Sequence, residues 1–127
     1  MTKYFKCSAC PSLVIKLNEE GCNPSCCGQP MVELKANTVD AAKEKHVPVV
    51  SVDGNSVRVT VGDVLHPMIE THYIVYIALE TNFGISIHYL KPGEPPHTSF
   101  GLADGERPIA ALAYCNLHGL WKTVLTD

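Results

Sequence analysis

The sequence predicts a mainly β protein, in which a small cysteine-rich N-terminal domain precedes a seven-stranded antiparallel sandwich of immunoglobulin-like type. Three observations lead to this prediction. Short runs rich in β-branched and aromatic residues recur over residues 47–125, and turn residues separate them. Five of the six cysteines lie within the first 27 residues. The single helical candidate is a short turn around residues 40–44.

The predicted strands are short and regularly interrupted. Val57, Val59 and Val61 alternate with polar residues, which is the period of a half-buried strand. The dipeptide Asp53-Gly54 predicts a hairpin turn before this strand. We expect the seven strands at residues 47–52, 56–61, 72–81, 85–90, 98–102, 109–114 and 120–125.

The composition limits the possible partners. The 127 residues are 46% hydrophobic and 18% charged, with a formal net charge of −3. This charge provides no basic surface for a phosphate backbone, so nucleic acid is not an expected partner. The apolar runs are too short to span a bilayer, and the N-terminus shows no hydrophobic signal region. We therefore expect a cytoplasmic protein that does not bind a membrane.

The N-terminal cysteines are spaced as metal ligands. Cys7-x2-Cys10 places two thiolates on one turn, and Cys26-Cys27 follows after 15 intervening residues. An adjacent pair can bind one metal only on a bent chain, so we expect a distorted tetrahedron. Spacing does not decide between iron and zinc, and a redox dithiol is the alternative. We interpret Cys22 as a spare thiol, with a disulfide partner or a substitute ligand as alternatives.

The cysteines and histidines divide the chain into two predicted domains. The first, residues 1–36, is too small to fold by hydrophobic burial alone and would need a metal. The second, residues 37–127, contains all six histidines. Its candidate ligands lie at predicted strand ends or in loops, and they are His46, His66, His72, Cys115 and His118. Four nitrogens and one sulfur exceed the closed tetrahedron of structural zinc and suit an iron with an open sixth position.

The motifs together resemble those of the desulfoferrodoxins, the two-iron superoxide reductases. The matching segments run along the whole chain in the family order. They are Cys7-x2-Cys10, Cys26-Cys27-Gly28-Gln29-Pro30-Met31, Glu44-Lys45-His46-Val47-Pro48, His66-Pro67-Met68, His72-Tyr73 and Cys115-Asn116-Leu117-His118-Gly119. The resemblance implies two iron ions per chain. One, which zinc could replace, would be bound by the four paired cysteines in a desulforedoxin-like domain. The other would have the four candidate histidines as equatorial ligands and Cys115 as the axial ligand.

The resemblance also implies an activity. The reaction would be the one-electron reduction of superoxide to hydrogen peroxide, in antioxidant defence, with an external donor such as rubredoxin and a homodimeric enzyme. Glu44 matches the family glutamate that can occupy the sixth position after oxidation. Lys45 matches the lysine beside the open site, where its charge would attract the anion. The alternatives are a non-catalytic electron carrier, a structural zinc protein and a dismutase.

A few residues depart from the family pattern or lie outside it. Pro11 stands where family members usually have glycine, and it has no N–H to donate to a ligand sulfur, which bears on the four-cysteine site. His88 and His97 match no family ligand, and we interpret both as structural or exposed. Tyr114 and Trp121 flank the Cys115 segment, and core packing is their expected role.

Overall fold

The computed structural model describes residues 2–125 and divides the chain into two compact β units. The N-terminal unit ends at Lys35, and the C-terminal unit begins at Ala36. Each unit has its own hydrophobic core. Within the described residues, none of the helices has the length and apolar character that crossing a membrane requires.

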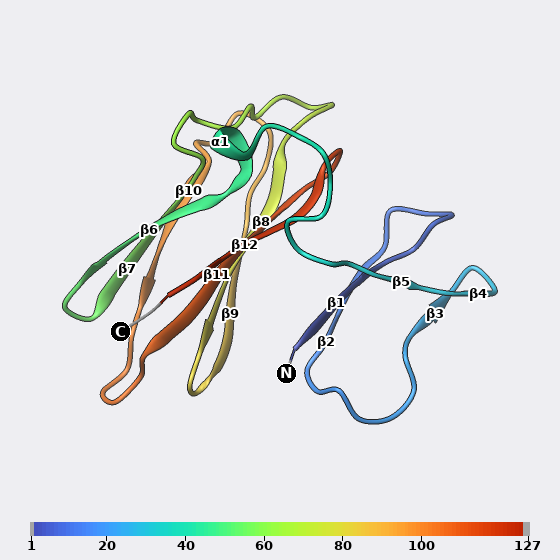
Figure 1. Ribbon diagram of the computed structural model, residues 1–127, viewed down its shortest axis with the longest axis horizontal. Coiled ribbons are helices and arrows are strands. Elements are labelled where there is room, and N and C mark those ends of the chain that lie inside the picture. The colour runs from blue at the N-terminus through green and yellow to red at the C-terminus, as the bar shows by residue number, and fades with distance from the viewer. Residues whose placement is uncertain (1, 126–127) are drawn as a thin grey trace. The chain divides into compact units, whose positions relative to one another are not determined.

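The N-terminal unit consists of two small antiparallel sheets (Figure 1). The first has the order β2-β1-β5, and the second pairs β3 with β4. Their bounds are β1 (Lys3–Lys6), β2 (Leu13–Lys16), β3 (Ser25–Cys26), β4 (Gln29–Pro30) and β5 (Val32–Glu33). The buried residues of its core cluster are Phe5, Cys7 and Met31. So small an apolar core is marginal without a further cross-link, as the sequence predicts.

The C-terminal unit is the expected seven-stranded antiparallel sandwich (Figure 1). One sheet has the order β10-β7-β6 and the other the order β12-β11-β8-β9. The bounds are β6 (Pro48–Asp53), β7 (Ser56–Val61), β8 (Ile74–Thr81), β9 (Gly84–Tyr89), β10 (His97–Gly101), β11 (Pro108–Cys115) and β12 (Gly119–Val124). Each strand lies within two residues of its predicted position. The predicted fold class is confirmed.

The predicted helical turn was placed too early in the chain. The helix is α1 (Lys43–His46), whereas the sequence suggested residues 40–44. Its turn is closed by the Val47 N–H, which donates to the Lys43 carbonyl at 2.9 Å. Pro48 then ends it, because the residue before a proline favours an extended conformation. The shift matters because it puts His46, a candidate ligand, in the last position of the helix.

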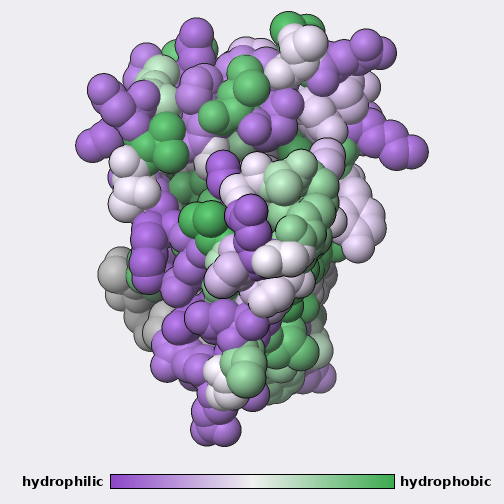
Figure 2. Space-filling view, turned by 90° about the vertical axis from the view of Figure 1, so that its right-hand side faces the viewer, coloured by the Kyte–Doolittle hydropathy of each residue, from purple (hydrophilic) through white to green (hydrophobic). Residues whose placement is uncertain are grey.

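The core lies between the two sheets. The alternating Val57, Val59 and Val61 are fully buried, and they pack in one cluster with Ile77 and Ala113 of the facing sheet. Burying each large aliphatic side chain stabilises the fold by roughly 1.5–3 kcal/mol. The surface is mixed, since hydrophobic and hydrophilic residues are interspersed on the face drawn in Figure 2.

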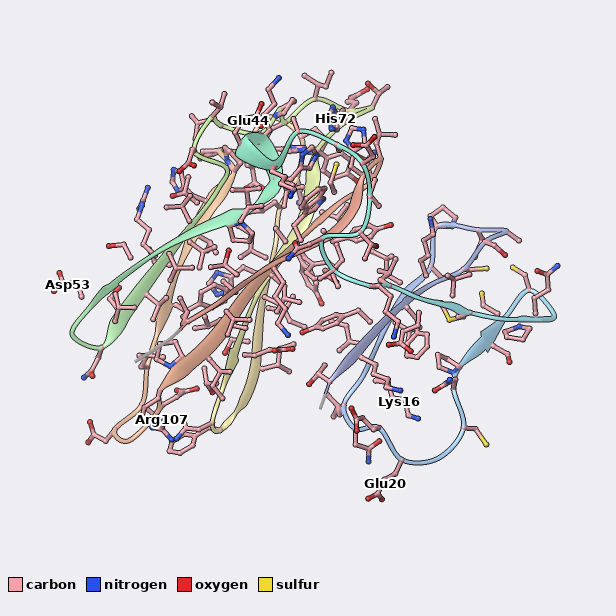
Figure 3. The ribbon with its side chains drawn as sticks, in the orientation of Figure 1. Lys16, Glu20, Glu44, Asp53, His72 and Arg107 are labelled. Atoms are coloured by element: carbon pink, nitrogen blue, oxygen red, sulfur yellow. The ribbon has the colours of Figure 1, made fainter. Side chains whose placement is uncertain are left out.

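The candidate ligands of the C-terminal unit lie in or directly beside the connections at one end of the sandwich. These are the α1 segment, the 62–73 connection between β7 and β8, and the turn between β11 and β12. Figure 3 shows Glu44 and His72 at this end of the C-terminal unit, with Asp53 and Arg107 toward the other end. A rigid sandwich thus supports loops from three distant parts of the sequence.

Gly62 allows the connection after β7 to pass close to α1. It has a φ of +85°, and a Cβ there would lie 2.4 Å from the Val64 carbonyl oxygen and 2.7 Å from that of Glu44. We predict that Gly62→Ala lowers the free energy of unfolding by more than about 2 kcal/mol, from left-handed strain plus the clash. Urea unfolding of the purified chain measures this loss.

Gly54→Ala is the matched control, because Gly54 also has a positive φ (+59°) but would meet nothing within 4 Å. It should lose only the strain contribution, about 1–2 kcal/mol. Equal losses in the two variants would contradict the assignment of a close approach at Gly62.

Candidate metal centres

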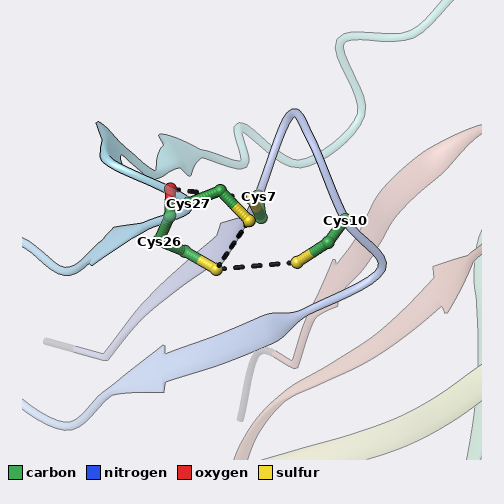
Figure 4. Close-up of side chains that lie close together, drawn as sticks. All are labelled: Cys7, Cys10, Cys26 and Cys27. Atoms are coloured by element: carbon green, nitrogen blue, oxygen red, sulfur yellow. Dashed lines mark hydrogen bonds between the residues drawn. The ribbon is translucent and has the colours of Figure 1, made fainter.

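The four paired cysteines converge on one point in the N-terminal unit, here called the four-cysteine site (Figure 4). The four Sγ atoms of Cys7, Cys10, Cys26 and Cys27 all lie within 4.8 Å of one another. The Sγ atom of Cys26 is 3.6 Å from that of Cys10 and 3.8 Å from that of Cys27. Sulfurs at the corners of a tetrahedron with metal–sulfur bonds of about 2.3 Å are separated by about 3.8 Å. The spacing fits one tetrahedral metal ion.

A left-handed backbone brings the adjacent cysteines to the same point. Cys27 has a φ of 55°, and Gly28 follows with 72°. In an extended chain, neighbouring side chains would point to opposite sides. The bend that the sequence requires is therefore made at Cys27 itself, a conformation that costs a non-glycine residue about 1–2 kcal/mol. Cys22 is exposed and lies outside this group.

Ser12 provides hydrogen bonds that Pro11 cannot. The side chain and backbone of Ser12 hydrogen-bond to Cys10 and lower its pKa to about 6. The Ala9 N–H also donates to the Cys7 Sγ at 3.3 Å. Although Pro11 has no N–H to donate, Cys10 still receives hydrogen bonds from Ser12. By contrast, hydrogen bonding to Cys10 raises the pKa of Cys27 to about 12, so the four thiols do not all ionise without a cation.

Four imidazoles form a square in the C-terminal unit. The ring centroids of consecutive members of the square are 4.7–5.0 Å apart, and their planes are nearly perpendicular, at 73–89°. The diagonal pair, His46 and His72, is 6.3 Å apart. In order around the square, the members are His46, His66, His72 and His118.

Cys115 joins this square. Its Sγ is 3.9 Å from the His118 Nδ1, and its ligand atom lies within 4.8 Å of those of the other three histidines. The His46 Nε2 is 3.1 Å from the His118 Nδ1. Two nitrogens at right angles around one ion, with bonds of about 2.1 Å, would be about 3 Å apart. We call these five residues the histidine site.

Local structure explains how Cys115 reaches the site. It is the last residue of β11, and the register with β8 shifts between Tyr114 and Cys115. Such a bulge redirects the side chain that follows it. Gly119, with a φ of +80°, then closes the short turn that contains His118.

Backbone carbonyls fix two of the imidazole rings. The His46 Nδ1 donates to the Ala42 carbonyl at 2.6 Å, and the His66 Nδ1 donates to the Pro67 carbonyl at 2.7 Å. This tautomer leaves each Nε2 with a free lone pair. Across residues 2–125, the buried side-chain nitrogens and oxygens without a hydrogen-bond partner are His66 Nε2 and His72 Nε2. A bound cation would satisfy both orphaned atoms.

Burial favours the neutral form of three of these imidazoles. It lowers the pKa of His66 to about 4 and also lowers the pKa values of His46 and His72. Burial raises the pKa of Cys115, against hydrogen bonds from the backbone of Leu117 and His118. Neutral imidazoles are the form that binds metals, and a cation would favour the thiolate of Cys115.

Glu44 and Lys45 lie beside the site rather than within it. Both are exposed residues of α1, and neither belongs to the described groups of closely spaced ligand atoms. Their charges nevertheless reach the imidazoles. Lys45 contributes to the lowered pKa of His72 and His46, and Glu44 acts in the opposite direction on His46.

The two remaining histidines lie apart from the site, as the sequence suggested. His88 stacks on Phe100 with ring centroids 4.3 Å apart, and its Nδ1 pairs with the Thr98 hydroxyl. His97 is half-buried at the start of β10. Neither belongs to the groups of closely spaced ligand atoms in the described chain.

Asn116 joins the two loops that present His72 and Cys115, a role that the sequence did not reveal. Its side-chain amide donates to the Thr71 carbonyl at 3.2 Å and accepts from the Tyr73 N–H at 2.9 Å. Its own N–H donates to the Tyr73 carbonyl at 3.2 Å. Asn116 stands inside the quoted motif, but its partners lie 43 and 45 residues away, beyond any local pattern.

Known proteins share both the sequence and the fold. The sequence model of the desulfoferrodoxin family matches residues 38–124. The chain is 44% identical to the desulfoferrodoxin of Syntrophotalea carbinolica, over 95% of this chain and 94% of that protein. It is 32% identical to the superoxide reductase of Thermococcus kodakarensis, over 76% of this chain and 98% of that one. The superoxide reductase structure from Treponema pallidum superposes with a TM-score of 0.82 at 36% identity, covering 97% of this chain and 98% of that one.

The sandwich with its histidine site, preceded by a four-cysteine unit, defines a protein with two candidate metal centres. Its structural neighbours include superoxide reductases, and the chain is an oxidoreductase. The chain belongs to the desulfoferrodoxin family.

The lowered histidine pKa values predict how the metal-free protein responds to acid. Because the folded-state pKa of His66 is about 4 and the unfolded value is near 6.5, the unfolded chain binds more protons between these values. Stability should therefore fall as the pH drops from about 6.5 toward 4. Calorimetry of the metal-free chain measures this, and His66→Gln should flatten the slope. A melting temperature that does not change from pH 7 to 4.5 would contradict the prediction.

The Asn116 hydrogen bonds predict an effect on metal binding. Asn116→Ala should weaken metal binding at the histidine site about tenfold, because the His72 loop is no longer joined to the Cys115 turn. Competition with a chelator measures the affinity. Asn82→Ala is the matched control, since Asn82 makes similar bonds to Gly105 and Arg107 at the other end of the sandwich. Equal loss of affinity in both variants would argue against a specific role for Asn116.

Proposed function

We propose that the chain is a superoxide reductase, which adds one electron and two protons to superoxide to form hydrogen peroxide. The observation that carries the proposal is the square of four imidazoles with the Cys115 sulfur beside it. Five ligands leave one position of an octahedron open for a small ligand, which a structural zinc site does not need. Relatives and structural neighbours described as superoxide reductases support the same activity.

The residues of the histidine site fit iron. His46, His66 and His72 would bind through Nε2 and His118 through Nδ1, with Cys115 as the thiolate ligand. Iron held by these residues would supply one-electron redox chemistry, with an external donor as the source of the electron. The Leu117 and His118 backbone groups that hydrogen-bond to Cys115 stabilise the thiolate, and a thiolate ligand favours electron donation.

Two residues of α1 complete the proposed active site. Lys45 provides positive charge at its rim, which attracts the superoxide anion although the chain carries a net charge of −3. Its ammonium group can also hold a water that supplies a proton. Glu44 lies next to it in the sequence, and its carboxylate would serve as a further metal ligand in the oxidised enzyme. Burial is the largest cause of the lowered pKa values of His72 and His46, and the charge of Lys45 adds to the lowering, which supports the reach of that charge into the site.

The remaining parts of the proposal follow from the family. The four-cysteine site would hold a second iron, which zinc could replace, in a domain of residues 1–36, and residues 37–127 would form the catalytic domain. We further propose a rubredoxin-like electron donor, a homodimer and a cytoplasmic location, in antioxidant defence. Support comes from relatives named desulfoferrodoxin that align over about 94–95% of this chain.

The ratio of peroxide to superoxide tests the activity. The reduced iron protein, in excess and without oxygen, is mixed with a known amount of superoxide, and the peroxide is counted. One peroxide per superoxide, with one iron oxidised each time, is the expected result. One peroxide per two superoxides with unchanged iron would identify a dismutase. Decay no faster than in buffer would leave an electron carrier or a structural metal protein.

The charge of Lys45 predicts an effect on the rate. Lys45→Ala should lower the second-order rate constant for superoxide about tenfold and weaken its dependence on ionic strength, since one attracting charge is lost at the site. Pulse radiolysis measures the rate. Lys43→Ala is the control on the same helix, because Lys43 is not among the charges that shift the pKa values of His46 and His72. Equal slowing in both variants would mean that the rate depends on the net charge of the chain and not on the position of Lys45.

A further inference from the structure

Trp121 contacts two members of the histidine site. Its indole ring stacks on the His46 imidazole, with centroids 4.9 Å apart and planes 27° apart. Its Nε1–H donates to the His118 carbonyl at 3.1 Å. The side chain is 1% exposed, so both contacts are shielded from water. Trp121 therefore does more than fill the core, which was its expected role.

The two contacts act on ligands that lie in short connections of the chain. His46 ends a helix of only four residues, and its Nδ1 bond to the Ala42 carbonyl holds one edge of the ring. Stacking against the flat indole holds the face of the same ring. His118 lies in the turn between β11 and β12, outside both strands, and the indole N–H fixes its backbone.

The strand that carries Trp121 makes this contact rigid. Trp121 lies on β12, where it pairs with Ala113 of β11. The same pair of strands leads to Cys115 at its end. The Trp121 side chain thus connects the β11–β12 pair, which positions the Cys115 sulfur, to the His46 ring. His46 lies about 70 residues earlier in the sequence.

We propose that Trp121 is a positioning residue of the histidine site, which holds the His46 ring and the His118 backbone in the orientation that binds the metal. A ligand set held this way binds its ion more tightly and changes less when the ion changes charge. The inference rests on the metal site of the proposed function, and it does not depend on which reaction the metal performs.

Two substitutions separate the two contacts. Trp121→Phe keeps an aromatic face against His46 but removes the N–H donor. Trp121→Leu removes both. Phe100→Leu is the matched control, because Phe100 is also a buried aromatic residue of the sandwich, 3% exposed, and stacks on His88 rather than on a member of the site. It should lower thermal stability without reaching the metal.

The test follows the metal rather than the activity. The full-length iron proteins are challenged with a chelator, and the electron paramagnetic resonance signal of the histidine-site iron is recorded as it is lost. We expect Trp121→Leu to lose this iron at least about tenfold faster than the wild type and with an altered signal, and Trp121→Phe to lie between them. Phe100→Leu should match the wild type in both readouts while melting at a lower temperature.

Two results would overturn the inference. In one, Trp121→Leu keeps the signal and the rate of iron loss of the wild type. In the other, Phe100→Leu changes both as much as Trp121→Leu does, which would make the effect one of general core packing. Failure of the proposed function would look different: the wild-type chain itself would bind no metal at the histidine site. That outcome would contradict both the proposed function and this inference.

Discussion

The main constraint on the C-terminal unit is the convergence of buried imidazoles on one point. His66 and His72 each direct a buried Nε2 without a partner toward the others, and such atoms cost free energy unless a cation binds them. The seven-stranded sandwich offsets this cost with a large apolar core. Its loops can therefore maintain an arrangement that is unfavourable until the metal arrives.

The N-terminal unit also brings metal ligands together on one point, but it has a much smaller apolar core to stabilise them. Its core is small, and it contains a strained Cys27 and thiols that do not all ionise without a cation. Metal binding would supply the stability that burial does not. The two units thus differ in kind: the sandwich folds around apolar side chains and presents its ligands at one end, whereas the N-terminal unit would fold around the ligands themselves.

The sequence predicted more of the fold than of the contacts that hold the metal ligands in place. Alternating residues such as Val57 and Val59 predicted strands because a period of two is a local property. Cys7, Cys10, Cys115 and His118 were found because Cys-x2-Cys and Cys-x2-His spacings are also local. The other histidines were candidates because they lie at predicted strand ends or in loops. The contacts of Asn116 and Trp121 join segments more than 40 residues apart or depend on ring orientation, so no local pattern contains them. The start of α1 was missed because no side chain caps it.

The central claim is that five side chains from three separate segments of the chain bind one iron ion. The most direct test is a crystal structure of the iron-loaded chain, with anomalous scattering recorded at the iron absorption edge. The account predicts an iron peak within bonding distance of four imidazole nitrogens and the Cys115 sulfur. An ion bound by only some of these five residues, or no iron at this end of the sandwich, would contradict it.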